Sequence, residues 1–213
     1  YELHLVVASA TISSRLQDCF ARLGAVTITC LERRYIVRNY TVSIESFRDI
    51  WEAIIYTTSS LIKKGDCCLV FLPGKYEIDT VECGLLKSGI SKKRIFHLHG
   101  DMEDEDIECS KRPTGFARCT LSTSKGEKAL TIADVHHVID SGFDRTAVDD
   151  KENIDMIDTR SMLATTVQRA GRVGRLKAGT YSIVVLADCP DPPDGKILFY
   201  GLSHASFGAA KLS

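Results

Sequence analysis

Short apolar runs and helical patterns alternate along the chain. Four segments repeat their apolar positions at helical spacing and predict helices at residues 14–23, 46–63, 76–88 and 162–175. Eight runs rich in β-branched residues predict strands at residues 3–8, 25–30, 35–42, 67–72, 94–99, 116–120, 135–140 and 180–186. These runs are apolar almost throughout, as in strands that are buried on both faces. The pattern predicts an α/β fold, a parallel sheet with helices on both faces.

Residues 143–159 predict a β-hairpin inserted into this alternation. Two arms, residues 145–148 and 154–157, flank a charged and polar tip at residues 149–153. From the sequence alone, a plain surface hairpin and a functional hairpin are equally good interpretations.

Length and composition are those of an ordinary globular protein. The chain has 213 residues, of which 44% are hydrophobic and 26% charged, enough for one α/β domain or one domain plus a fragment. The net charge of −1 gives no global attraction to nucleic acid, so any nucleic-acid contact must come from local patches. Prolines, aspartates and a glycine cluster at residues 190–195 and predict the end of the globular domain.

The eight cysteines and six histidines show no metal-site spacing. We expect the cysteines to be reduced, buried small hydrophobes, the histidines to be structural, and no metal site. No apolar run approaches the length of a membrane span, and residues 1–7 lack the layout of a signal peptide. These features predict a cytoplasmic chain without a membrane segment, with a nuclear or viral replication compartment as the alternatives.

Residues 168–175 carry the strongest chemical signal, the octet Gln-Arg-Ala-Gly-Arg-Val-Gly-Arg. On a helix, Gln168, Arg172 and Arg175 would project from one face. Two guanidinium forks and an amide suit a γ-phosphate and its attacking water, and the glycines would let another surface approach closely. A basic, solvated helix that docks on RNA is the alternative.

This octet resembles motif VI of superfamily-2 helicases, in the form typical of DExH/DEAH RNA helicases and viral NS3-like helicases. Three more stretches resemble helicase motifs in the expected order. Ser9-Ala10-Thr11 is similar to motif III, which implies that Ser9 and Thr11 couple hydrolysis to strand movement. By itself, this tripeptide is also a good turn or helix N-cap.

The segment 69–77 resembles motif IV, which implies that Gly74 and Lys75 contact the RNA backbone. Lys75 taken alone is equally consistent with a solvated surface charge. Residues 120–132, followed by 138–143, resemble motif V. That resemblance implies that Ser122 and Thr123 bind RNA, and that Gly126 and Thr131 lie near the nucleotide.

The resemblance implies a RecA-like fold and three parts: the end of a first RecA-like domain (1–12), a second, helicase C-terminal domain (13–189), and a linker or the start of a following domain (190–213). It also implies an NTP-dependent RNA helicase in which Gln168 orients water, Arg172 and Arg175 act as arginine fingers, and Arg169 contacts nucleotide. The chain lacks a P-loop, so ATP or another NTP with Mg²⁺ would depend on the missing first domain, and the chain alone would be inactive. The implied partners are RNA and that first domain.

Three alternatives stay open on the sequence. A scaffold of helicase origin would bind RNA or a protein without catalysis, and a DNA translocase of the same superfamily would act on DNA. The source could be cellular or viral. By resemblance, the hairpin at residues 143–159 would help to separate strands.

Overall fold

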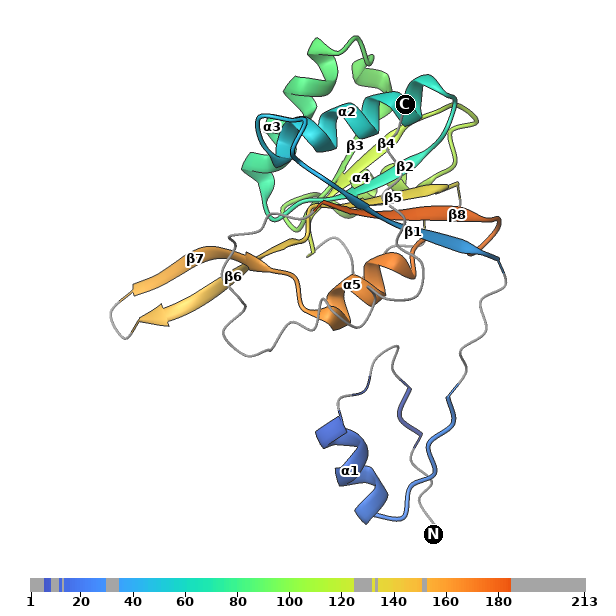
Figure 1. The fold of residues 1–213 in the computed structure, drawn as a ribbon, viewed down its shortest axis with the longest axis vertical. Coiled ribbons are helices and arrows are strands. Elements are labelled where there is room, and N and C mark those ends of the chain that lie inside the picture. Colours follow the sequence, from blue (N-terminus) through green and yellow to red (C-terminus); the bar gives the residue numbers. More distant parts are fainter. Residues whose placement is uncertain are drawn as a thin grey trace. The chain divides into compact units, whose positions relative to one another are not determined.

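Figure 1 shows the computed structural model, which describes residues 6–8, 12, 14–29, 35–124, 132, 134–150 and 153–184. The chain divides into two compact units, Tyr1–Arg33 and Arg34–Ser213. The first unit contains α1, Ser14–Arg22, which the sequence predicts. The strand predicted at 25–30 is wrong for its described part, and residues 6–8 form no strand either. Val26 and Ile28 are 86% and 90% exposed, so these apolar positions are not packed against other described residues.

The second unit is built on a six-stranded sheet in which every pair of neighbours is parallel, in the order β1-β8-β5-β2-β4-β3. This confirms the predicted parallel sheet, with small differences at strand ends. The bounds are β1 Val37–Val42, β2 Cys68–Phe71, β3 Ile95–Leu98, β4 Cys119–Ser122, β5 His137–Asp140 and β8 Gly179–Val184.

Among the described residues of this unit, four α-helices and one short 3₁₀ turn accompany the sheet. They are α2 Ile50–Lys63, α3 Lys75–Lys87, η1 Lys92–Arg94, α4 Asp104–Lys111 and α5 Leu163–Ala170. Helix α2 begins later than predicted because Asp49 caps it, its carboxylate accepting the Glu52 amide at 2.8 Å. Helix α4 carries three acidic residues in its first turn, as the sequence suggests for a helix start.

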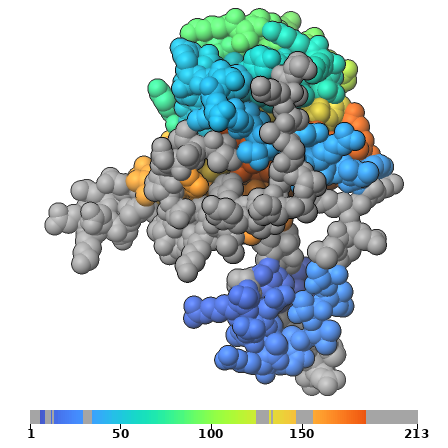
Figure 2. Space-filling view, in the orientation of Figure 1, coloured from blue at the N-terminus to red at the C-terminus, as the bar shows by residue number. Residues whose placement is uncertain are grey.

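The two faces of the sheet are covered by different helices, which confirms the prediction for both faces. Alternate residues along β2 point to opposite sides. Cys68 and Val70 pack in one cluster with α2 and α3, whereas Leu69 and Phe71 pack in the other with residues of α4 and α5. Figure 1 shows α2 and α3 on one side of the sheet and α5 on the other, and in Figure 2 side chains of α2 and α3 form a closed layer.

The predicted hairpin is confirmed, with longer arms than the sequence indicates. Strands β6, Phe143–Asp150, and β7, Asn153–Arg160, pair antiparallel as a separate two-stranded sheet. It follows the carboxyl end of β5 and projects away from the main sheet (Figure 1).

The cysteine prediction holds in part. Cys67, Cys68 and Cys119 are buried thiols, and burial raises the pKa of Cys119 to about 12. Cys19, Cys83 and Cys109 are exposed, contrary to expectation, while Cys30 and Cys189 lie outside the described residues. Within the described ranges, no three or more His, Cys, Asp or Glu side chains are grouped to hold a metal ion. No helix found there has the length and apolar character needed to span a bilayer.

Candidate nucleotide and nucleic-acid site

The carboxyl ends of three strands bring several predicted RNA-contacting residues to one edge of the sheet. In the strand register, Phe71 of β2 lies opposite Ser122 of β4 on one side and Asp140 of β5 on the other. The segments that follow these strands therefore emerge side by side. They are the turn at Gly74, the loop at Thr123 and the base of the hairpin. Ligands of open parallel sheets bind at this edge.

Gly74 is the buried N-cap residue of α3, and its neighbour Lys75 is exposed. A Cβ atom on Gly74 would lie 2.2 Å from Arg145 Nη1 and 2.8 Å from Glu77 Oε2, so a larger residue there would require these side chains to shift. No side-chain hydrogen bond caps the start of α3. Amide groups at such a helix start are suitable donors to phosphate, which is compatible with the backbone contact predicted for Gly74 and Lys75.

Ser122 and Thr123 lie at the end of β4, and both are buried. The Ser122 hydroxyl donates to the Thr123 carbonyl at 3.0 Å, and the Thr123 amide donates to Leu98 at 3.0 Å. The Ser122 hydroxyl is thus engaged within the fold, which gives no support to its predicted RNA contact. Ser9, Thr11, Gly126 and Thr131 lie outside the described residues.

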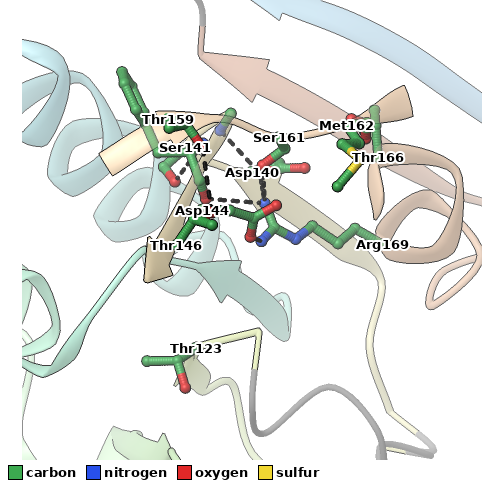
Figure 3. Close-up of polar contacts among 12 residues, drawn as sticks. Thr123, Asp140, Ser141, Asp144, Thr146, Thr159, Ser161, Met162, Thr166 and Arg169 are labelled. Atoms are coloured by element: carbon green, nitrogen blue, oxygen red, sulfur yellow. Dashed lines mark hydrogen bonds and ion pairs between the residues drawn. The ribbon is translucent and has the colours of Figure 1, made fainter. Parts of the chain in front are cut away.

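Arg169, predicted to contact nucleotide, is instead the centre of a buried polar cluster (Figure 3). Its side chain is 0% exposed. Nη1 donates to Asp140 Oδ1 at 2.7 Å and to Ser161 Oγ at 2.8 Å, and Nη2 donates to Asp144. The guanidinium carbon also lies 5.0 Å from the centre of the Phe71 ring. These contacts give Arg169 a structural role and leave its predicted nucleotide contact without support.

Asp140 completes this cluster from the end of β5. Its carboxylate is fully buried and accepts hydrogen bonds from the Gly142 amide at 2.9 Å and the Tyr181 hydroxyl at 2.7 Å. Burial, and then the negative charge of Asp140, raise the pKa of the Tyr181 phenol, which keeps it a donor. The cluster therefore ties α5 to β5, β8 and the hairpin.

Helix α5 ends at Ala170, whereas the sequence predicts a helix to residue 175, so Arg172 and Arg175 do not share a helix face with Gln168. Residues 171–175 form a turn, called the finger turn below. It begins at Gly171, the C-cap of α5, and Gly174 adopts a φ of +78°, which is not a helical conformation. Gln168 is exposed on the last turn of α5. The three residues remain close in the chain, but a turn rather than a helix orients the arginines.

Within the finger turn, the two arginines influence each other electrostatically. Burial, followed by the positive charge of Arg172, lowers the pKa of Arg175, although a guanidinium remains charged at neutral pH. Arg175 Nε donates to the Gly171 carbonyl at 3.1 Å, which holds its side chain against the turn. Two neighbouring like charges of this kind form a favourable site for an anion such as a phosphate.

Comparison with known proteins identifies the fold family. Residues 47–177 match the helicase conserved C-terminal domain family. The chain belongs to this family. As the sequence motifs predict, it is the second RecA-like domain of the superfamily-2, DExH/DEAH type.

The relatives of this helicase domain are named as ATP-dependent RNA helicases. It is 36% identical to the probable helicase spindle-E of Drosophila ananassae over 70% of this chain and 10% of that protein. It is 33% identical to the putative helicase DHX57 of Homo sapiens (79% and 14%), and 28% identical to HrpB of Escherichia coli (84% and 22%). The crystal structure of the E. coli DExH-box NTPase HrpB superposes with a TM-score of 0.67 at 26% identity, over 83% of this chain and 22% of that one. The chain thus spans less than a quarter of each relative.

Sequence reasoning missed a second charged group in the helicase domain, at the hairpin base. Arg145 donates to Asp158 at 2.7 Å and 3.0 Å and to Glu77 at 2.8 Å. The hydrogen bond to Asp158, and then that to Glu77, raise the pKa of Arg145. Arg145 and Asp158 face each other across the hairpin, so opposite charges at mirrored positions about the tip were a usable signal. No local pattern points to Glu77.

We expect Gly174→Ala to destabilise the helicase domain more than Gly89→Ala does. Both glycines have positive φ, which costs a residue with a Cβ about 1–2 kcal/mol. A Cβ on Gly174 would also lie 2.4 Å from Val37 Cγ2 of β1, whereas one on Gly89 meets nothing within 4 Å. Denaturant unfolding of the two variants isolates this clash. Equal losses of unfolding free energy would show that β1 does not support the finger turn.

Proposed function

We propose that this helicase domain is one half of an NTP-driven RNA motor, and that Arg172 and Arg175 bind the γ-phosphate in a cleft shared with a first RecA-like domain. The observation that supports the proposal is the finger turn, in which Arg172 and Arg175 lie three residues apart and Arg175 is influenced by the charge of Arg172. A γ-phosphate bound there would be attracted by both positive charges. Its oxygens match the guanidinium fork.

In the proposed mechanism the arginines act mainly in the transition state. Negative charge spreads over the γ-phosphoryl oxygens during transfer, and a finger that stabilises it contributes about 10³–10⁵ in rate, roughly 4–7 kcal/mol. Gln168, exposed beside the turn, would orient the attacking water. Bound Mg²⁺ would neutralise phosphate charge. We assign its ligands to the first domain, along with the phosphate-binding lysine.

The RNA contact is proposed for the carboxyl edge of the sheet. Lys75 is exposed there beside the uncapped start of α3, and the loop at Thr123 follows the neighbouring strand. Backbone amides and a lysine bind phosphates without reading bases, so we expect affinity that is independent of sequence and weakened by salt.

Residues 1–12 are proposed to close a first RecA-like domain. Support comes from the described residues of this segment, since Val6 and Val7 are 89% and 51% exposed. Such a surface is suited to burial in a larger domain. The predicted boundary between residues 12 and 13 stays a prediction, because the compact unit extends to Arg33.

The isolated chain is expected to hydrolyse ATP barely or not at all, since it supplies only one wall of the cleft. The same chain extended upstream by a complete first RecA-like domain should turn over ATP and be stimulated by RNA. Steady-state phosphate release from both proteins tests this. Turnover by the isolated chain that is insensitive to Arg172→Ala would contradict the two-domain mechanism.

The same assay separates the alternatives. An extended protein that binds RNA without turnover would be a scaffold, and equal stimulation by single-stranded DNA would favour a DNA translocase. The proposed strand-separating role of the hairpin predicts that shortening its tip reduces duplex unwinding while RNA-stimulated ATP hydrolysis continues.

A further inference from the structure

Two consecutive residues at the hairpin base are ion-paired to two different parts of the helicase domain. Asp144 accepts from Arg169 of α5, three residues before Arg172 in the chain. Arg145 donates to Glu77 in the first turn of α3, directly after the Gly74–Lys75 turn. Neighbouring residues of a strand point to opposite sides, so one short stretch of β6 connects both elements.

Both of these contacts are rigidly held. Arg169 is completely buried and also bound by Asp140 and Ser161, while Glu77 is 6% exposed. The carboxylate of Asp158 in β7 accepts hydrogen bonds from Nε and Nη2 of Arg145. Hydrogen-bonded ion pairs that share residues strengthen one another in a low-dielectric environment, so we expect a displacement at one end of this network to affect the other.

The Arg145 guanidinium lies directly against the turn proposed to bind RNA. A Cβ on Gly74 would lie 2.2 Å from Nη1, so a side chain at this position would require Arg145 to move. A shift of that turn on binding a phosphate therefore requires Arg145 to move with it.

The geometry points to Asp144 and Arg145 as positioning residues that couple RNA binding at the Gly74–Lys75 turn to the orientation of Arg172. This inference rests on the proposed function. RNA at the turn moves or stiffens the hairpin base through Glu77 and Arg145. Through its ion pair, Asp144 then changes the position of the Arg169 side chain. The end of α5, from which the finger turn begins, moves with it. Neither residue touches nucleotide or RNA. Their effect is on how strongly RNA stimulates hydrolysis.

The test measures ATP turnover with and without single-stranded RNA, in the protein that joins this chain to a complete first RecA-like domain. Arg145→Gln and Glu77→Gln each remove the ion pair while keeping a polar side chain. We expect each to reduce the RNA stimulation ratio about fivefold or more, as for a typical coupling between sites. RNA-free turnover should stay within about twofold of the parent. The double variant should lose no more than either single variant.

Asp158→Asn is the matched control. It weakens the pair inside the hairpin but leaves Arg145 bound to Glu77, so the stimulation ratio should be retained. Thermal unfolding of each variant checks folding, and the two single variants break the same contact from opposite sides. Unchanged stimulation in both, or additive losses in the double variant, would overturn the inference.

Hydrogen exchange in the unmodified protein gives a readout that needs no substitution. Adding RNA without nucleotide should change the exchange of amides in α5, and unchanged α5 exchange with protected α3 amides would contradict coupling. The proposed function and the coupling can be tested apart. If the parent protein shows no RNA-stimulated hydrolysis, the proposed RNA motor is disproved. If RNA stimulates the parent and the variants equally, only the coupling is disproved.

Discussion

Replacing Arg172 by alanine is expected to lower ATP turnover about a thousandfold in the protein that joins this chain to a complete first RecA-like domain. Arg172 lies in the finger turn beside Arg175, where burial, followed by the charge of Arg172, lowers the pKa of Arg175. Alanine removes the charge that would oppose the developing negative charge on the γ-phosphoryl group. RNA-stimulated phosphate release at saturating ATP measures the effect.

The kinetic constants distinguish this role from simple nucleotide binding. An interaction made mainly in the transition state lowers kcat while KM changes little, whereas uniform binding would raise KM and leave kcat intact. Arg94→Ala is the control, because Arg94 is an exposed arginine of η1. It should leave both constants near those of the parent. A kcat loss below tenfold for Arg172→Ala would remove it from the catalytic step.

The sheet was predictable because its buried strands are continuous apolar runs in the sequence. Residues 67–72 are apolar without interruption, and the structure places Leu69 and Val70 in clusters on opposite faces of β2. The hairpin was equally visible, from two apolar arms around a polar tip. The strand predicted at 25–30 failed because apolar composition alone cannot show whether a partner strand is present.

The end of α5 was not predictable from periodicity. Val173 lies beyond the helix, yet it packs in the same core cluster as Ala170. The apolar spacing therefore continues past the last helical residue, and the pattern extends the helix too far. Gly171 and Gly174 were the contrary signals: Gly171 is the C-cap of α5, and Gly174 adopts a positive φ in the turn that follows.

The predicted site residues come from resemblance to known motifs and stay predictions, whereas the contacts that depend on distant parts of the chain were missed. The motif pattern treats Arg169 and Arg172 alike, although burial separates them: Arg169 is 0% exposed and Arg172 is partly exposed. Glu77 and Arg145 are far apart in the chain and meet only because β2 and β5 are neighbours. Such pairs have no periodicity to reveal them.

Replacing Arg169 by methionine is expected to cost about 3–5 kcal/mol of unfolding free energy, because it leaves buried carboxylates without a counter-charge. Asp140 is fully buried, and the Asp144 side chain is 16% exposed. The exposed pair Arg48–Glu52 provides the control, since Arg48 is 84% exposed and Arg48→Ala should cost less than about 1 kcal/mol. Urea unfolding of the parent, Arg169→Met and Arg48→Ala proteins compares their free energies of unfolding.

The double variant Arg169→Met with Asp140→Asn tests the electrostatic cause of that loss. An asparagine keeps one acceptor oxygen for the Gly142 amide and places an NH2 group beside the Tyr181 hydroxyl, which can accept from it. Because the buried charge is removed, the second substitution should recover part of the stability. If the double variant is less stable than Arg169→Met alone, packing rather than charge governs the stability of the cluster.

A loss of unfolding free energy below 1 kcal/mol for Arg169→Met without nucleotide would leave the arginine available for the nucleotide contact that the motif implies. A large loss would show that Arg169, the first arginine of the octet, stabilises the fold. Arg172 is then the arginine proposed to contact nucleotide.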